Sequence, residues 1–377
     1  MSSAGLTSTG GESLPVITSV TARTLVVPLR QPLRTASGVV QSAPLLLIDV
    51  ETDAGVTGRA YLFTYTPKVL GASAHLVTSL SELLVGQAIA PQRLSLHLQN
   101  QFRLLGTAGL LDMVLATIDT ALWDALARFT GQPLIHLLGG QVGTNGGRLL
   151  CYASYGMDSL QETLRNVGEA LEQGFRAIKI KIGHPTLAQD LQIVRGAQRA
   201  LNGRAALLVD YNQSLSVPEA VIRCRALDDE GLTWIEEPTR FDDHQGHAHI
   251  AASIHTPLQL GENLWGARQI ANSLEASASD CMMPDLARVG GVTGWLQASG
   301  VCAARQVPVS NHFYQEVSIH LLQATPTAHM LEYFPMADPI LQQPLHQEDG
   351  YAVSPDRPGH GMEWDEHAVE RYRVNLN

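Results

Sequence analysis

Short apolar runs that each stop at one polar residue recur through the middle of the chain. The runs LLVDYN, TWIEEP, LQLGEN, CMMPD and VPVSNH carry Asp210, Glu236, Glu262, Asp285 and His312 at or near their ends. These residues are 26, 26, 23 and 27 positions apart, about the length of a strand, a loop, a helix and a return. Such a repeat predicts an α/β barrel of the TIM type, whose functional residues lie at the carboxyl ends of its strands.

The pattern before the barrel predicts a separate α+β domain. β-Branched runs at 16–30 and 45–63 predict an antiparallel sheet that turns at Asp53 and Gly55. From about residue 68 to 138, apolar residues recur at three- and four-residue spacing, which indicates helices. Between the first strands, residues 30–40 are polar and interrupted by Pro and Gly, so we expect a mobile loop that can act as a lid.

These patterns divide the chain into four parts. Residues 1–15 are rich in Ser, Thr and Gly and are predicted to be disordered. We assign residues 16–145 to the α+β domain, with its lid at 30–40, and residues 146–345 to the barrel. The turn-rich segment 346–377 is expected to return to the N-terminal domain.

Composition narrows the class of protein. The formal net charge of −11 argues against a nucleic-acid-binding protein, which needs a basic surface. No apolar run approaches the ~20 residues of a membrane helix, and the N-terminus lacks the features of a signal peptide. We therefore predict a cytoplasmic protein without a membrane or nucleic-acid partner. The four cysteines stand singly, which disfavours disulfides and zinc sites.

Three carboxylates at consecutive strand ends suggest a metal site. Asp210, Glu236 and Glu262 would converge at one mouth of the barrel, and oxygen ligands of this kind suit a hard cation such as Mg²⁺. A single acidic residue is more often a solvated loop carboxylate. Three in register on adjacent strands weaken that alternative.

Two lysines and a histidine are candidate bases. Lys179 and Lys181 alternate in a strand and so share a face, where two close, desolvated ammonium groups would depress each other's pKa. The alternative is an edge strand with two solvated lysines. His312 ends the strand after Asp285, a pair that suits a general base held in one tautomer by its carboxylate. Alone, such a histidine would as often be a core or loop residue.

The predicted strand order sets these bases on opposite sides of the mouth. Lys181 lies on the second strand and His312 on the seventh, with the carboxylates between them. A carboxylic acid bound there could lose its α-proton to one base and regain a proton from the other. The metal, Lys179 and Glu332 could share the charge that develops on the enediolate, provided that Glu332 is protonated or shares a proton.

An ordered set of motifs extends beyond these residues. IDTALWDALARFTGQPL, AIKIKIG, VDYNQSL, TWIEEPT, MPDLARVGGVTGW and ATPTAHMLE together resemble the enolase superfamily, mandelate racemase subgroup, from about Val16 to the C-terminus. The resemblance implies an α+β capping domain on a modified (β/α)7β TIM-type barrel, one Mg²⁺ per subunit, and a homo-octamer.

The resemblance also implies roles for the candidate residues. The ligands of Mg²⁺ would be Asp210, Glu236 and Glu262. Lys181 and the His312–Asp285 pair would be the two bases. The groups that hold the substrate carboxylate would be Lys179 and Glu332, the latter as electrophilic catalyst, and further substrate-binding positions would be Ser154 and Asn212.

The lid and its surroundings depart from the family pattern. Leu33 and Val40 remain apolar, but Ser37 replaces an aliphatic residue and Gln31 an aromatic one. Aromatic residues that could still line the substrate pocket are Tyr65, Phe313 and Phe334. The resemblance therefore supports the family's reaction chemistry in this chain better than it supports the family's substrate.

Three functions remain open at this point. The first is racemisation of mandelate or a similar aromatic 2-hydroxy acid by 1,1-proton transfer through a metal-stabilised enediolate. The second is dehydration of an acid sugar, in which the same proton abstraction is followed by loss of the β-hydroxyl with His312 as general acid; Arg34 favours it. The third is a barrel that only binds a metal or a partner.

Overall fold

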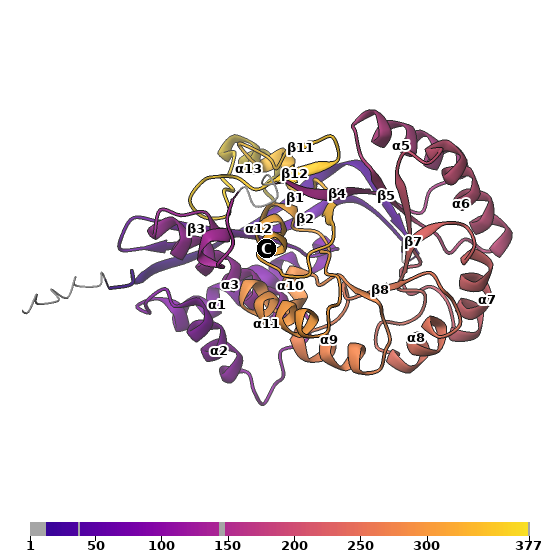
Figure 1. Cartoon of the computed structure of the whole chain (residues 1–377). Coiled ribbons are helices and arrows are strands. Elements are labelled where there is room, and N and C mark those ends of the chain that lie inside the picture. Colours follow the sequence, from indigo (N-terminus) through magenta and orange to yellow (C-terminus); the bar gives the residue numbers. More distant parts are fainter. Residues whose placement is uncertain (1–12, 37, 143–147, 376–377) are drawn as a thin grey trace, which may run out of the picture.

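A computed structural model describes residues 13–36, 38–142 and 148–375 of the chain. It consists of an N-terminal sheet with helices beside it and a barrel whose helices form an outer ring (Figure 1). Of residues 1–15, which are predicted to be disordered, residues 1–12 lie outside the described part of the chain, and so does the predicted domain boundary at 145.

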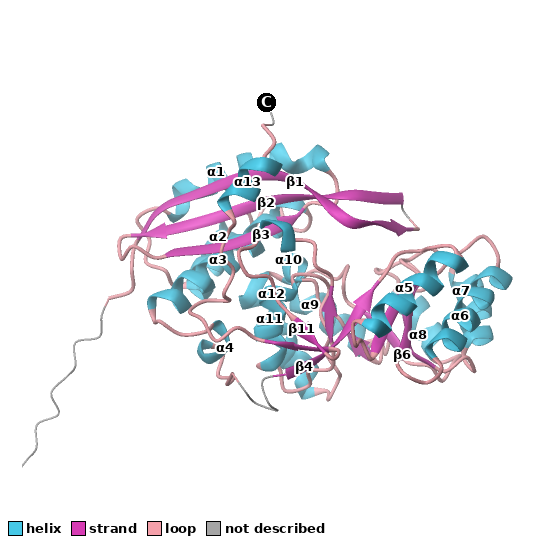
Figure 2. Ribbon diagram, turned by 90° about the horizontal axis from the view of Figure 1, so that it is seen from above, coloured by secondary structure: helices cyan, strands magenta, loops and turns pink. Residues whose placement is uncertain are grey.

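Three antiparallel strands form the N-terminal sheet. They are β1 (Ile17–Thr35), β2 (Gly38–Thr52) and β3 (Thr57–Phe63), in that order. Helices α1 (Leu70–Leu84), α2 (Pro91–Gln101) and α3 (Leu110–Phe129) lie along the sheet (Figure 2). The short helix η1 (Pro67–Val69) precedes α1, and the short helix α4 (Leu134–Leu137) follows α3. The run Leu45–Ile48 in β2 is fully buried, so the sheet and α3 share one apolar core.

The prediction of a loop at 30–40 is wrong. Leu33 pairs with Val40 and Thr35 with Gly38, so β1 and β2 continue as a hairpin through this segment. A register shift between Pro28 and Leu33 accommodates the prolines that suggested a loop, as bulges do at sheet edges. Gly38 has φ +139, a conformation that other residues rarely adopt.

A closed parallel barrel follows. Its strands are β4 (Arg148–Ser154), β5 (Ala177–Lys181), β6 (Ala206–Asp210), β7 (Leu232–Glu236), β8 (Leu258–Leu260), β9 (Cys281–Met282), the bridged segment 309–312, and β10 (Leu331–Tyr333). β10 pairs in parallel with β4 and so closes the ring. The confirmed fold is thus the modified TIM-type barrel with an N-terminal capping domain.

Helices alternate with the strands on the outside of the barrel (Figure 1). They are α5 (Leu160–Glu172), α6 (Leu187–Leu201), α7 (Val217–Leu227), α8 (His244–Ala251), α9 (Gly266–Glu275), α10 (Leu286–Val289), α11 (Gly291–Ala304) and α12 (Gln315–Gln323). Capping boxes begin two of them, with Ser159 before α5 and Thr186 before α6. Each capping side chain satisfies backbone N–H groups that the first turn leaves unpaired.

The C-terminal segment contacts both domains. After η3 (Asp338–Ile340), the short strands β11 (Gln347–Glu348) and β12 (Tyr351–Val353) extend the sheet beside β4. Helix α13 (Glu366–Tyr372) then lies against β1, where the Val374 N–H donates to the Thr24 carbonyl at 2.9 Å. Arg23 of β1 also pairs with Glu366 at 2.5 Å.

The helix α3 joins the two domains through polar contacts. Asp119 accepts hydrogen bonds from the backbone N–H and the hydroxyl of Thr293, and the Trp123 indole donates to the same hydroxyl at 2.9 Å. Asp124 of the same helix is fully buried and accepts from the N–H of His360, in the C-terminal segment, at 2.9 Å. These contacts hold the capping domain at a fixed position over the barrel.

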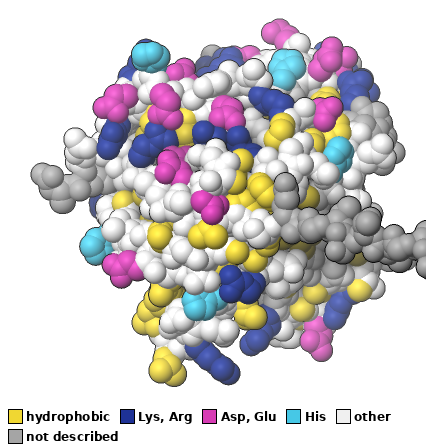
Figure 3. Space-filling view, turned by 90° about the vertical axis from the view of Figure 1, so that its left-hand side faces the viewer, with side chains coloured by type: hydrophobic (Ala, Val, Ile, Leu, Met, Phe, Trp, Pro, Cys, Tyr) yellow, Lys and Arg dark blue, Asp and Glu magenta, His cyan; other side chains and the backbone are white. Residues whose placement is uncertain are grey.

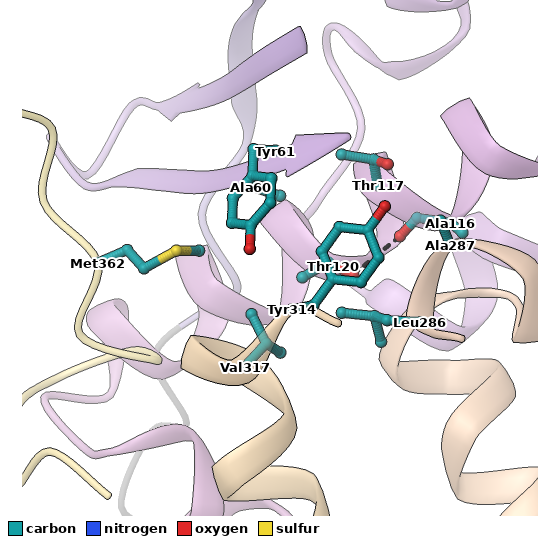
Figure 4. A pocket seen from close by; sticks show the side chains of 10 residues that line it. All are labelled: Ala60, Tyr61, Ala116, Thr117, Thr120, Leu286, Ala287, Tyr314, Val317 and Met362. Atoms are coloured by element: carbon teal, nitrogen blue, oxygen red, sulfur yellow. Dashed lines mark hydrogen bonds between the residues drawn. The ribbon is translucent and has the colours of Figure 1, made fainter. Parts of the chain in front are cut away.

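A void of about 10 Å³, the size of one water molecule, lies in the same interface. Figure 4 shows Tyr61 of β3 and Thr117 of α3 facing it from the capping domain and Tyr314 from the barrel. Nearby, Tyr61 donates its hydroxyl to Glu316 at 2.8 Å.

Glu316 gives this interface a pH dependence. Burial, with a smaller contribution from Asp338, raises the pKa of Glu316 to about 7, whereas in an unfolded chain it is about 4.3. The folded protein therefore binds a proton that the unfolded chain has released, and the free energy of unfolding falls as pH rises between these values. Glutamine does not titrate, so the free energy of unfolding of Glu316→Gln should fall less with rising pH than that of the wild type, by on the order of 1–3 kcal/mol. Urea unfolding at pH 5 and pH 8 measures it, and equal pH dependence in both proteins would contradict it.

The surface of the molecule is of mixed charge. On the face drawn in Figure 3, acidic and basic side chains are interspersed among polar and apolar ones. Among the described residues, no helix has the length and apolar content needed to cross a membrane.

Candidate active site

The three predicted carboxylates meet at the mouth of the barrel. Asp210, Glu236 and Glu262 end β6, end β7 and follow β8, and one oxygen from each lies within 4.8 Å of the others. All three are buried. Burial, and after it the Asp210 carboxylate, raise the pKa of Glu236 against the opposing effect of Lys179.

This cluster fits a divalent cation. The oxygen Oε2 of Glu262 is buried and accepts no hydrogen bond within the described part of the chain. A hard cation satisfies a carboxylate oxygen that accepts no hydrogen bond and relieves repulsion between neighbouring carboxylates.

The two lysines of β5 reach different carboxylates. Lys179 donates to Glu236 at 3.0 and 3.1 Å and pairs with Glu332 at 2.9 Å. Lys181 contacts Asp210, at one end of the carboxylate cluster. Both lysines are buried, as a position on the inner face of the barrel predicts.

The prediction that the pKa values of Lys179 and Lys181 are depressed is wrong. Burial and the neighbouring ammonium of Lys179 both favour neutral Lys181, but the carboxylates, led by Asp210, outweigh them and raise its pKa. The pKa of Lys179 is likewise raised, since the attraction of Glu236 and Glu332 exceeds the effect of burial.

The predicted histidine–carboxylate pair is present. His312 Nδ1 lies 2.6 Å from Asp285 Oδ2, and the backbone bridge between these residues holds their strands together. The other oxygen of Asp285 accepts from the N–H groups of Ala287 and Arg288, so the carboxylate cannot turn freely. His312 Nε2 lies 3.3 Å from Glu262 Oε2. His312 therefore contacts the opposite end of the cluster from Lys181.

The environment of Glu332 favours its ionised form. It accepts from the Phe313 N–H at 2.9 Å and pairs with Lys179. Burial opposes its ionisation, but Lys179 and His312 outweigh burial and lower the pKa of Glu332. Of the two predicted forms, a protonated Glu332 is disfavoured by this lowered pKa, whereas a Glu332 that shares a proton with Lys179, 2.9 Å away, stays a prediction.

A cavity of about 410 Å³ opens between the carboxylates and the hairpin. Its apolar wall consists of Leu33, Val39, Val40, Tyr65 and Phe313. Its polar wall includes Lys181, His312, Asn212, Gln213, Asn263 and Arg288. One half of the cavity thus suits an apolar group and the other a charged one.

Several predicted substrate-binding residues do not line this cavity. Lys179 and Glu332 are fully buried beneath it, and Ser154, at the end of β4, lies outside its wall. Phe334 packs against the Phe313 ring behind the wall, with ring centroids 5.0 Å apart. Ser37 lies outside the described residues.

Asn212 has a second function besides lining the cavity. Its side chain donates to Asp210 Oδ2 at 2.9 Å and its N–H to Oδ1 at 2.7 Å, so it orients a carboxylate of the cluster. Its φ of +45 is one of several positive values around the mouth: Tyr65, Asn212, Gln213, Glu237, Phe313 and Tyr314. Non-glycine residues in this conformation concentrate at functional sites, where the surrounding structure compensates for the strain.

Sequence reasoning missed a polar network beside the cluster. Asn263 donates to Glu237 at 2.6 Å and to Glu262 at 3.1 Å, and Arg288 donates to the Glu262 carbonyl at 2.7 Å. Glu237 and Asn263 each directly follow a carboxylate of the cluster, which was the available signal. Arg288 lies three residues after Asp285, on the first turn of α10, and no strand-end pattern marks it.

Comparisons with known proteins agree with this architecture. Residues 162–368 match the family described as Enolase C-terminal domain-like, and residues 17–139 match Mandelate racemase / muconate lactonizing enzyme, N-terminal domain. A solved enolase from Bradyrhizobium, complexed with magnesium and mandelic acid, is 43% identical, with a TM-score of 0.92, over 97% of this chain and 100% of that one.

Other relatives are named for different reactions. L-talarate/galactarate dehydratase from Salmonella typhimurium is 34% identical over 70% of this chain, and the match covers 66% of that protein, just under two thirds. L-talarate dehydratase from Polaromonas sp. JS666, solved with Mg and L-glucarate, is 27% identical with a TM-score of 0.88, over 96% of this chain and 98% of that one. The chain belongs to the mandelate racemase subgroup of the enolase superfamily.

Proposed function

We propose that this protein is a Mg²⁺-dependent racemase of 2-hydroxy acids that carry an aromatic or similarly apolar group, of which mandelate is the simplest. The observation that carries the proposal is the position of the two bases. Lys181 contacts the Asp210 end of the carboxylate cluster and His312 the Glu262 end, and both line one cavity with an apolar wall.

The site chemistry follows from these positions. When bound by Asp210, Glu236 and Glu262, the Mg²⁺ ion supplies positive charge that stabilises the charge developing on the substrate carboxylate. With a cation sharing its charge, Asp210 would stabilise the Lys181 ammonium less, and the adjacent Lys179 ammonium favours neutral Lys181. Neutral Lys181 can therefore act as a base.

Proton transfer occurs on the two faces of the α-carbon. Lys181 Nζ takes the α-proton from one face, and the electron pair of the broken C–H bond moves into the carboxylate, giving the enediolate. The imidazolium of His312 returns a proton from Nε2 to the opposite face, which inverts the configuration. The reverse reaction uses the same groups in exchanged roles.

Asp285 sets the tautomer of His312. A carboxylate 2.6 Å from Nδ1 keeps the proton there and leaves Nε2 as the reacting atom. We expect Asp285→Asn to lower racemisation about 10²- to 10⁴-fold, because an amide can stabilise the wrong tautomer and cannot stabilise the imidazolium. The helix cap at Oδ1 can survive this substitution. Polarimetry measures the rate; unchanged activity in a folded variant would contradict the assigned role.

A second candidate is an acid-sugar dehydratase. The observation in its favour is the polar wall, where Gln213, Asn263 and Arg288 could bind sugar hydroxyls. Relatives that share the subgroup are named dehydratases. In this reaction His312 would donate its proton to the departing β-hydroxyl, which leaves as water, and the resulting enol would become a 2-keto acid. Arg34, which favoured this function in the sequence, does not line the cavity.

One experiment separates these functions. The Mg²⁺-loaded protein is incubated in D₂O with each enantiomer of mandelate and, separately, with a panel of acid sugars. Deuterium at the α-carbon together with loss of optical rotation supports the racemase. Formation of a 2-keto acid from acid sugars, with no reaction of mandelate, would show that the protein is a dehydratase and not a racemase. No reaction across the panel would support a non-catalytic binding protein.

A further inference from the structure

Arg288 is a partly buried cation in the cavity wall that the proposed proton transfers do not use. The cap that Asp285 provides to α10 fixes its backbone. Its Nη1 donates to the Glu262 carbonyl at 2.7 Å and contacts Asn263 Oδ1. Within the described part of the chain, its Nε and Nη2 donate no hydrogen bond, and no carboxylate forms an ion pair with it. Nη1 is thus held by the protein, whereas Nε and Nη2 can donate to a ligand.

Aromatic rings hold the guanidinium at the junction of the two walls. Its central carbon lies 5.2 Å from the centroid of the Tyr65 ring and 5.9 Å from that of Trp265. Tyr65 in turn lies 6.4 Å, centroid to centroid, from Phe313 of the apolar wall. Stacking of this kind fixes the plane of an arginine, so its unused donors keep one direction.

A fixed guanidinium with unused donors in a cavity wall can give a charge-assisted hydrogen bond to a ligand oxygen. We infer that Arg288 binds an acceptor oxygen on the apolar part of the substrate. The preferred substrates are then 2-hydroxy acids whose ring carries a hydroxyl or another oxygen, rather than purely hydrocarbon rings. This inference rests on the proposed racemase function and names its substrate class.

Size-matched substrates test the inference on the wild-type protein. Ring-hydroxylated mandelates are compared with mandelates that carry a methyl group at the same ring position, with α-deuterium exchange and racemisation as readouts. We expect kcat/KM to favour the hydroxyl over the methyl compound by about tenfold or more at one ring position, because a charge-assisted hydrogen bond is lost with the methyl group.

Two arginine variants connect this preference to its residue. Arg288→Met is expected to abolish the preference for hydroxyl over methyl in kcat/KM, whatever its overall activity. Arg34→Met is the matched control. Arg34 alternates along the hairpin with Leu33 and Thr35, which line the cavity, and does not line it itself. This control should keep the full preference.

The results of these experiments test the role of Arg288 separately from the racemase function on which it rests. Exchange of both compounds at equal rates at every ring position in the wild type would overturn the inference alone, even if Arg288→Met did not fold. A preference that survives in folded Arg288→Met would also overturn it. If no compound in the panel exchanged its α-proton, the proposed racemase function would fall, and this inference with it.

Discussion

Replacement of His312 by asparagine is expected to lower racemisation about a thousandfold or more in both directions. A positioned general acid or base contributes about 10²–10⁴-fold to a proton transfer, and racemisation needs one base on each face. Asparagine can still donate a hydrogen bond to Asp285, which lies 2.6 Å from His312 Nδ1, so the fold should tolerate it. Optical rotation, followed from either enantiomer of the substrate, measures the rate.

The control is a histidine outside the barrel mouth. The side chain of His255 is fully exposed, so His255→Asn should racemise the substrate at the wild-type rate. Racemisation by His312→Asn within tenfold of the wild type would mean that another group serves this face of the substrate.

Replacement of Glu262 by glutamine is expected to weaken Mg²⁺ binding on the order of a hundredfold and to remove most activity at any practical Mg²⁺ concentration. The affinity of an oxygen-ligand site follows the number of charged ligands. Glu262 supplies one of three and has a buried oxygen that accepts no hydrogen bond within the described residues. Calorimetric titration with Mg²⁺ measures the affinity directly, without reference to turnover.

Glu237 provides a matched control next to the cluster. It is also a buried glutamate, but burial and the neighbouring Glu262 raise its pKa, which favours its protonated form. Glu237→Gln therefore changes little charge and should bind Mg²⁺ within a few-fold of the wild-type affinity. Equal loss of affinity in both variants would show that the cluster is not the cation site.

The barrel and its carboxylates could be predicted because they follow from spacing. Strand ends that recur every 23 to 27 residues bring Asp210, Glu236 and Glu262 to one mouth, and strand order alone predicts the pairing of His312 with Asp285. The order of strands also separates Lys181 from His312. These features depend on topology, which hydrophobic patterns report well.

The features that could not be predicted depend on the three-dimensional positions of side chains and loops. Prolines near residue 30 suggested a loop, but a register shift keeps the hairpin paired. The raised pKa of Lys181 depends on contact with Asp210, which residue spacing does not reveal. Arg288 lies on a helix turn and reaches the cavity only through the fold. The predicted octamer and cytoplasmic location stay predictions.

The stereochemistry of deuterium exchange in paired single-base variants tests the two-base arrangement most directly. Lys181→Met and His312→Asn are each incubated with Mg²⁺ and single enantiomers of mandelate in D₂O, and α-deuterium is followed by NMR. We predict complementary behaviour: each variant exchanges the α-proton of one enantiomer, and the two variants act on opposite enantiomers. Exchange of the same enantiomer by both variants, or of both enantiomers by either one, would contradict the placement of one base on each face.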